Sequence, residues 1–162
     1  MNYEILPGPS LAELARTALA RAAAAIVSEA SPGNARQDVA GRVPVRTRPD
    51  GSPLLLAATG SMLEQRLTAC PDAVTVSVPA AVPFSSLRLT GTARAVARDM
   101  AARITACAVA LRSVEFGGAV PAEVPVEAFH AAAPIRTVLT CRCRSGPGHE
   151  YRHRQSRRAA GG

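Results

Sequence analysis

The residues with the most distinctive chemistry lie close together near the C-terminus. Cys141 and Cys143 precede His149 and His153 in a C-x-C-x5-H-x3-H pattern. Thiolates and imidazoles are ligands that zinc prefers, and four of them suffice for a tetrahedral site. The spacing fits no standard zinc finger, however, and no hydrophobic residue is placed to anchor a small zinc fold. We therefore interpret the pattern as a coincidence of composition and predict no metal site.

The remaining ionisable residues limit the possible catalysis. All 19 basic residues are arginine, which excludes Schiff-base chemistry and a P-loop, because both need a lysine amine. The three histidines form no Ser-His-Asp order, and no pair of carboxylates indicates acid–base catalysis, so the catalytic residues are unknown. We interpret His130 as a surface or helix-capping residue, with haem ligation as the alternative. Cys70 and Cys107 lie among apolar residues and are predicted to be inert buried thiols.

The positive charge is concentrated in the last 29 residues. Residues 134–162 contain seven arginines and a single acid, Glu150, and therefore account for six of the seven net positive charges. This segment has no apolar periodicity, so we predict a solvated, disordered tail. The alternative is salt-sensitive, non-specific binding of nucleic acid, which the single aromatic residue, Tyr151, does little to support.

The N-terminal region predicts a soluble, cytoplasmic protein. Glu13, Arg16 and Arg21 interrupt the only N-terminal apolar stretch, which argues against a secretory signal. No run of 18 apolar residues is present, so no membrane span is expected. The four cysteines are then expected to be reduced thiols.

The elements that must position any site are mostly short strands. Ser10 and Glu13 form a capping box, and apolar residues at helical spacing predict a helix that continues to Ile26 and ends before Ser31. Strands are predicted at Arg42–Arg48, where Pro44 indicates an edge or a strand start, and at Pro53–Thr59. Pro49-Asp50-Gly51 is a turn signal, so these two strands form a hairpin.

Residues 61–132 are also predicted to form short strands and helices. The expected elements are a short helix capped by Ser61, strands at Ala73–Val78 and Leu87–Val96, a helix from Asp99 to Leu111, a strand at Val114–Val120 and a short helix at Pro125–Ala132. Gly91 in mid-strand indicates a bulge or bend. The sequence therefore predicts a mainly β (α+β) domain at 10–133, with a lead-in at 1–9 and the tail at 134–162.

Two stretches resemble a known superfamily. VPVRTRPDGSPLLLAATGS followed by MLEQRLTACPDAVTVSV, and LRLTGTARAV at Leu87–Val96, are similar to the pyridoxamine 5'-phosphate oxidase-like, FMN-binding split-barrel proteins. Among these, the actinobacterial haem-utilisation-type proteins look most similar. The resemblance implies a small antiparallel split β-barrel with an N-terminal helix and flanking helices. It also implies a homodimer with FMN, or haem as the alternative, at the interface between its subunits.

The same resemblance indicates a cofactor site. It places the FMN phosphate near the start of the helix that follows the hairpin. The expected contacts are Arg46, Arg48, Thr59, Gly60, Ser61 and Arg66. Met62 and Leu63 stand where a flavin oxidase would have basic residues, so phosphate binding has fewer charged donors here. Changing Ser61 and Arg66 together to Ala is expected to weaken cofactor binding at least about tenfold.

Three functions remain open at this point. The first is a homodimeric barrel that binds FMN or haem, which would be a flavin-dependent oxidoreductase if it is an enzyme. The second is a cofactor-free structural or interaction barrel, which the apolar pair Met62-Leu63 favours. The third is non-specific nucleic-acid association through the basic tail.

Overall fold

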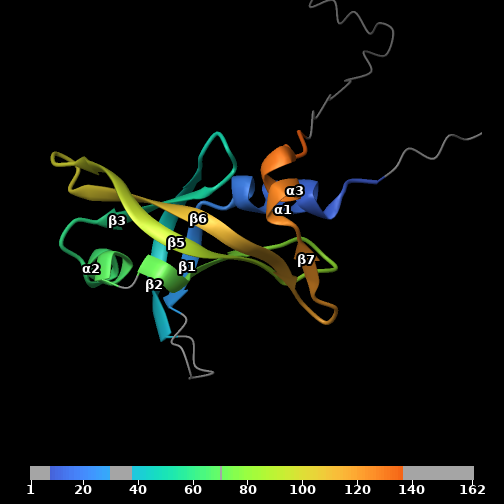
Figure 1. Cartoon of the computed structure of the whole chain (residues 1–162), viewed down its shortest axis with the longest axis horizontal. Helices are drawn as coiled ribbons and strands as arrows, with labels where there is room; N and C mark the ends of the chain where they lie inside the picture. Colours follow the sequence, from blue (N-terminus) through green and yellow to red (C-terminus); the bar gives the residue numbers. More distant parts are fainter. Residues whose placement is uncertain (1–7, 30–37, 70, 137–162) are drawn as a thin grey trace, which may run out of the picture.

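The computed structural model describes residues 8–29, 38–69 and 71–136 (Figure 1). The elements in order are α1 (Leu11–Arg21), β1 (Ala24–Glu29), β2 (Asp38–Thr47), β3 (Pro53–Ala58), α2 (Met62–Ala69), a 3-10 turn (Pro71–Ala73), β4 (Val74–Pro79), β5 (Ser86–Asp99), β6 (Ile104–Gly117), β7 (Ala122–Val124) and α3 (Val126–Ala131). The predicted lead-in is described only from Gly8, and Cys70, the C-x-C-x5-H-x3-H pattern and nearly all of the arginine-rich tail lie outside the described residues.

Six antiparallel strands close into a barrel. The strands follow the order β3-β2-β1-β4-β5-β6-β7, and an additional pairing between β3 and β6 joins the two sides. β7 is an extra strand that pairs only with the far half of β6. Closure removes unpaired strand edges from the sheet. The predicted mainly β, antiparallel barrel is thus confirmed.

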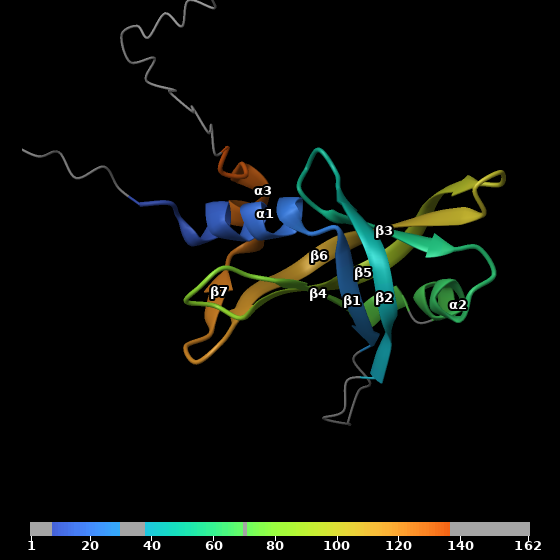
Figure 2. The ribbon, with the colours of Figure 1, turned by 180° about the vertical axis from the view of Figure 1, so that it is seen from behind.

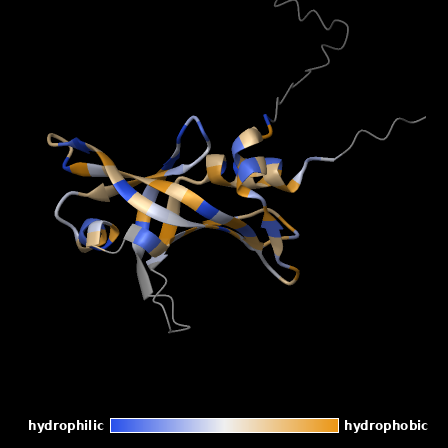
Figure 3. Ribbon diagram, viewed as in Figure 1, coloured by the Kyte–Doolittle hydropathy of each residue, from blue (hydrophilic) through white to orange (hydrophobic). Residues whose placement is uncertain are grey.

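The barrel interior is packed with valine and leucine, because alternate residues on each strand point inward. Figure 3 shows the resulting alternation of hydrophilic and hydrophobic residues along β5. The largest fully buried side chains are Phe116, Phe129, Leu19, Leu55, Leu87, Leu89, Val27, Val43, Val45, Val74, Val76 and Val78. Cys107 is also fully buried, as predicted.

β1 was not predicted, and the N-terminal helix is shorter than expected. The capping box of Ser10 and Glu13 is present, but α1 ends at Arg21, and Ala22 has extended backbone angles. β1 then pairs with both β2 and β4. Ile26 and Val27 are β-branched and favour a strand. The prediction of a helix through Ile26 was therefore wrong, because pairing on both sides of β1 outweighs the helical propensity of its alanines.

The predicted helix from Asp99 to Leu111 was also wrong. Asp99 ends β5, and its side chain accepts a hydrogen bond from the amide of Ala102 at 2.9 Å. Arg103 has a φ of 54°, which completes a tight turn into the 14-residue strand β6. The predicted strand at Val114–Val120 overlaps the second half of β6, which ends at Gly117. Alanine-rich sequence fits a helix in isolation, but here it pairs with β5 on one side and β3 on the other.

Other local predictions match the structure. Pro49, Asp50 and Gly51 form the β2–β3 turn, where Gly51 has a φ of 89°. The pairing of β5 and β6 shifts register at Thr90 and Gly91, which is the predicted bulge. β2 is an interior strand that begins at Asp38, so the prediction that Pro44 marks an edge or a strand start was wrong. Pro44 lies where its pairing with β1 ends and its pairing with β3 begins.

The helices lie at opposite ends of the long axis of the barrel. α1 and α3 pack side by side near β7, whereas α2 lies beside β2 and β3 at the other end (Figures 1 and 2). α3 begins directly after Pro125, as predicted. None of the helices among the described residues has the length and apolar character that crossing a bilayer requires. The two ends of the molecule thus carry different helices. The residues predicted to contact a cofactor are divided between these two ends.

Candidate functional site

The start of α2 holds four of the six predicted contact residues. Ser61 caps the helix, because its Oγ accepts a hydrogen bond from the amide of Glu64 at 3.2 Å. The amide of Thr59 donates to the carbonyl oxygen of Arg103 at 2.9 Å, which joins β3 to the start of β6. Gly60 lies between them, and Arg66 is half-buried one turn further along α2. The predicted cluster at this helix N-terminus is therefore assembled.

A carboxylate of the chain already occupies this N-terminus. Glu64 is 5% exposed, and its Oε2 accepts a short hydrogen bond from the amide of Gly60. Its Oε1 accepts from the hydroxyl of Thr105 at 2.7 Å and from the guanidinium of Arg98 at 3.3 Å. Thr59 and Thr105 also share a hydrogen bond at 3.0 Å. Glu64 thus supplies the negative charge that the amides at this site attract.

These contacts hold Glu64 in its ionised form. The hydroxyl of Thr105 contributes most to a pKa below the ordinary value of 4.5, followed by the amide of Gly60, while Arg98 adds a smaller effect. Burial opposes them by favouring the neutral acid. Because the net shift is downward, the site carries a negative charge at neutral pH.

Arg46 and Arg48 lie at the opposite end of β3. Arg46 is directly opposite Leu54, and the amide of Arg48 donates to the carbonyl oxygen of Ser52 at 2.9 Å. β3 has six residues, so this end lies about 17 Å from the start of α2. The structure thus divides the six predicted contacts into two groups.

A row of paired residues crosses the outer face of four strands. Arg46 on β2 lies opposite Leu54 on β3, Leu54 opposite Ala108 on β6, and Ala108 opposite Arg94 on β5. Val45, Leu55, Val109 and Ala93 point into the barrel, so the row points outward. We call these four residues the outer row. Neighbouring strands are about 4.8 Å apart, so the two arginines lie about 14 Å apart along the sheet, with the two apolar residues between them.

A cavity of about 480 Å³ lies beside the outer row, and we call it the arginine hollow. Its lining residues are Arg48, Asp50, Ser52, Thr92, Arg94, Ala108, Val109, Ala110, Leu111 and His130. Arg48, Arg94 and His130 are exposed. The hollow therefore combines two guanidinium groups and an imidazole with a floor of small side chains from β6.

The β2–β3 turn fixes the carboxylate side of the hollow. Oδ1 of Asp50 accepts hydrogen bonds from the hydroxyl of Ser52 at 2.6 Å and from its amide at 2.9 Å. The hydrogen bond from the Ser52 hydroxyl is the main cause of a lowered pKa for Asp50; Arg48 and His130 add smaller effects in the same direction, and burial opposes them. The hydroxyl and the amide of Ser52 thus hold the Asp50 carboxylate within the turn.

Arg16 of α1 supports the same turn from behind. Its guanidinium donates to the carbonyl oxygens of Asp50 at 2.9 Å and Phe129 at 3.4 Å, and it lies 5.4 Å from the centre of the Phe129 ring. Arg16 is 7% exposed, so this contact is buried. Gly51 is required beside it, because a Cβ there would lie 1.7 Å from the Arg16 guanidinium. Arg16 therefore joins α1, the turn and α3 into one support.

His130 has a defined orientation in the hollow. Its Nδ1 lies 2.8 Å from the carbonyl oxygen of Asp50. Because a carbonyl oxygen only accepts hydrogen bonds, Nδ1 is the donor in this contact, which leaves Nε2 as the ring nitrogen for any other ligand. This is the arrangement in which histidine binds metals. The predicted interpretation of His130 as an exposed residue near a helix end matches its position.

Among the polar side chains that line the hollow, only Arg48 was predicted from the sequence as a cofactor contact. Thr92 and Arg94 lie on the outer face of β5, at alternate positions. Their neighbours Ala108 and Ala110 could not be placed, because residues 99–111 were expected to be helical. Ile104, Thr105, Ala106 and Cys107 show no strict apolar–polar alternation, so the sequence offered no signal that would have placed them on a strand.

Comparisons with known proteins support the fold. No protein-family model and no curated protein sequence matches the chain. A heme-binding protein from Mycobacterium smegmatis aligns with a TM-score of 0.62 and 19% identity, over 80% of this chain and 63% of its own. A protein of unknown function from Agrobacterium tumefaciens aligns with a TM-score of 0.56 and 13% identity, over 80% of this chain and 64% of its own.

A third solved structure is aligned over nearly its whole length. It aligns with a TM-score of 0.58 and 18% identity, over 73% of this chain and 94% of its own. The chain spans less than two thirds of the mycobacterial and Agrobacterium proteins. At these identities the likeness concerns the barrel fold, and it is consistent with the split barrel that the sequence predicts.

Proposed function

We propose that this barrel binds a planar cofactor with acidic groups, of the haem type, on the outer face of β3, β5 and β6. The observation that carries the proposal is the arginine hollow beside the outer row. Arg48 and Arg94 offer charge-assisted donors to carboxylates, and the residues of β6 from Ala108 to Leu111 form an apolar floor. A ligand site of this kind is mainly apolar, with a few polar groups that fix the orientation.

The residues fit haem better than FMN. The FMN phosphate is expected at the start of α2, where the ionised carboxylate of Glu64 already accepts the hydrogen bonds. A phosphate there would meet a like charge at short range. Haem brings carboxylates for the arginines and iron for Nε2 of His130, and the heme-binding neighbour shares the barrel fold. Flavin remains the second ligand to test, and it would make the protein an oxidoreductase, since the flavin supplies the redox chemistry.

The proposed partner is a second copy of the chain. Arg48, Arg94 and Ala110 are exposed, so a ligand in the hollow would be covered on one side only. Binding sites bury most of their ligand's surface. A homodimer that brings a second barrel over the outer row would supply the missing cover.

The test is a titration of the full-length protein with haemin and, separately, with FMN, followed by visible absorption. We expect a saturable shift of the haemin band. Changing Arg48 and Arg94 together to Ala should weaken haemin binding by at least about tenfold, which equals about 1.4 kcal/mol. Arg42→Ala is the matched control, because Arg42 is an exposed arginine on β2 that lies opposite Ile26, away from the hollow.

His130→Ala separates iron ligation from binding. The expected result is a haemin band at a different wavelength, because the residue that we assign to the iron is lost, while Arg48 and Arg94 still hold the carboxylates. If wild-type protein gives no saturable shift with haemin, the proposal is wrong. A shift with FMN alone would transfer the site to a flavin.

The second candidate function is a cofactor-free interaction barrel. Met62 is 67% exposed at the start of α2, and Met100 is 78% exposed in the turn between β5 and β6, which lies at the same end of the molecule as α2 (Figure 1). Exposed methionines are common on surfaces that bind other proteins. Absence of a spectral shift with both haemin and FMN would favour this function.

A further inference from the structure

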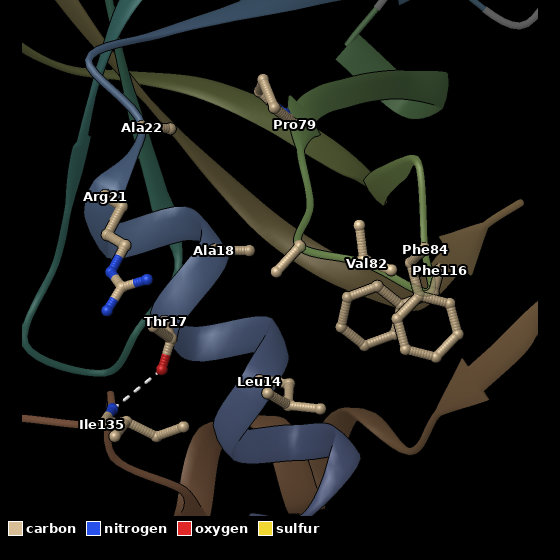
Figure 4. A pocket seen from close by; sticks show the side chains of 11 residues that line it. Leu14, Thr17, Ala18, Arg21, Ala22, Pro79, Val82, Phe84, Phe116 and Ile135 are labelled. Atoms are coloured by element: carbon tan, nitrogen blue, oxygen red, sulfur yellow. Dashed lines mark hydrogen bonds between the residues drawn. The ribbon is translucent and has the colours of Figure 1, made fainter.

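A second cavity lies at the α1 end of the barrel. It has a volume of about 250 Å³ and is bordered by α1, the loop that follows β4, β6 and the residues after α3. Figure 4 shows Leu14, Ala18 and Ala22 of α1 directed toward the loop across this space, which we call the α1 pocket. It shares no lining residue with the arginine hollow. The lining residues are Leu14, Thr17, Ala18, Arg21, Ala22, Pro79, Ala81, Val82, Phe84, Phe116 and Ile135.

The α1 pocket is an apolar surface that the described residues leave partly uncovered. The rings of Phe84 and Phe116 stack with their centres 4.2 Å apart and lie across the pocket from Ala18. Val82 on the loop side is 93% exposed, and Ile135 at the opposite rim is 39% exposed. Large aliphatic side chains on both rims are thus in contact with water, which costs free energy. A surface of this kind indicates an apolar partner.

The chain itself reaches the rim of the α1 pocket after α3. The amide of Ile135 donates to the hydroxyl of Thr17 at 2.8 Å, which fixes the chain against α1 (Figure 4). The same hydroxyl donates to the carbonyl oxygen of Glu13 at 2.7 Å, so it is engaged on both sides. Ile135 is the last residue but one of the described part of the chain. The residues that follow therefore start from a fixed point on the rim of the pocket.

The segment that follows carries suitable side chains near its start. Val138 and Leu139 are the only Val, Leu, Ile, Met or Phe residues in 137–162. They come three and four residues after Ile135, so an extended chain can place them about 10–14 Å from it. A helix with its side chains is about 10–12 Å across, so this length is enough to cross α1 and reach the stacked phenylalanines. A cavity of about 150 Å³ can hold a benzene ring. A pocket of about 250 Å³ therefore has room for two aliphatic side chains.

We propose that the α1 pocket is the docking site of the chain's own segment 137–140, with the side chains of Val138 and Leu139 packed against Ala18 and Phe84. Burial of the two aliphatic side chains, together with the exposed rims of the pocket, stabilises this contact. The arginines further along the chain stay outside, because burying a guanidinium in an apolar pocket without a partner is unfavourable. This docking is independent of the proposed haem site.

The direct test is nuclear magnetic resonance of the full-length, isotope-labelled protein. We expect nuclear Overhauser effects between the methyl groups of Val138 or Leu139 and the ring protons of Phe84, because such effects arise only between groups in contact. Their absence would overturn the proposal. A mixture of labelled and unlabelled protein shows which chain supplies the segment. Effects that arise only between different copies would overturn docking within one chain.

Substitutions in the segment test its contribution to stability. Changing Val138 and Leu139 together to Asp should lower the melting temperature by about 3 °C or more, because their aliphatic contacts are lost. The matched control changes Ala159 and Ala160 together to Asp, which adds the same charge further along the same chain. Its melting temperature should stay within about 1 °C of the wild-type value. Equal melting temperatures for the two double variants would contradict the proposal.

Ala18→Leu tests the place of docking, because the larger side chain fills the pocket. It should displace the segment, so the methyl–ring effects disappear and the two Asp substitutions at 138 and 139 no longer change the melting temperature. Ala20→Leu is the matched control, because Ala20 is exposed on the opposite face of the same helix, and it should leave both results unchanged. Ala22→Leu repeats the test if Ala18→Leu does not fold. An undiminished effect of the Asp substitutions in the filled pocket would overturn the assignment of the segment to this site.

Discussion

The two ends of β3 are both places where the chain could hold an anion, and they differ in how their polar groups are used. At the start of α2, Gly60, Thr105 and Arg98 all donate to the single carboxylate of Glu64. At the other end, Arg48 and Arg94 line an open hollow whose one carboxylate, Asp50, is directed into its own turn. One end is thus satisfied within the fold, and the other presents positive charge to solvent.

This difference shows why a helix N-terminus is weak evidence for a ligand site. The free amides at the start of a helix attract any anion, including a side chain three or four residues further along the same helix. Glu64 is in that position, so the chain satisfies its own helix. The hollow also contains a carboxylate, Asp50, but its Oδ1 accepts hydrogen bonds from Ser52 in its own turn, and Arg48 has only a smaller effect on its pKa. We therefore expect ligand-binding variants and stability variants to separate between the two ends.

The largest effect is expected from Gly91, which shapes the hollow side of the barrel. A Cβ at this position would lie 2.0 Å from the carbonyl oxygen of Ala110, so Gly91→Val cannot fit without moving β6. We expect a loss of about 3 kcal/mol or more in the free energy of unfolding, measured by urea denaturation. Ala95→Val on the exposed part of the same strand is the control. Equal stability of the two variants would show that the bulge does not hold β5 and β6 in this register.

The α2 end should determine part of the response to acid. The pKa of Glu64 is lowered in the folded protein, so its ionised form stabilises the fold above the ordinary value of 4.5. That stabilisation is lost as the pH falls through the lowered pKa. Glu64→Gln removes the carboxylate, so the stability difference between wild type and variant should shrink between neutral pH and about pH 3. Urea midpoints at both pH values measure this, and a difference that does not change with pH would contradict it.

Local signals in the sequence predicted those parts of the fold that local contacts determine. The capping box of Ser10 and Glu13 and the turn at Asp50 each depend on residues close in sequence, and both are present. β1 and the first half of β6 depend instead on strands far away in the chain. Alanines in both segments fit helical and alternating patterns equally well, so the sequence alone could not decide between them.

The candidate site depends on the same distant strand pairing, which the sequence did not predict. The resemblance grouped Arg46 and Arg48 with Ser61 and Arg66, whereas the structure places the two pairs at opposite ends of β3. Arg94 became a neighbour only when β6 was placed between β3 and β5, which brings Leu54 and Ala108 into one row. Glu64 was a visible acid three residues after Ser61, and the capping-box pattern that identified Ser10 and Glu13 would have identified this pair as well.

The smallest effect is expected at the end that the resemblance favours. Changing Ser61 and Arg66 together to Ala should alter haemin affinity by less than about threefold, in contrast to the tenfold or greater loss that the sequence suggested. The reason is that Ser61 Oγ caps the helix through the amide of Glu64, whose carboxylate then occupies the anion position. Loss of this cap should cost about 1 kcal/mol of stability, so a melting curve must accompany the titration to show that the barrel is folded. The comparison is with the double variant at Arg48 and Arg94. A larger loss of affinity at Ser61 and Arg66 than at the hollow would place the ligand at α2 and require Glu64 to move from its present contacts when the ligand binds.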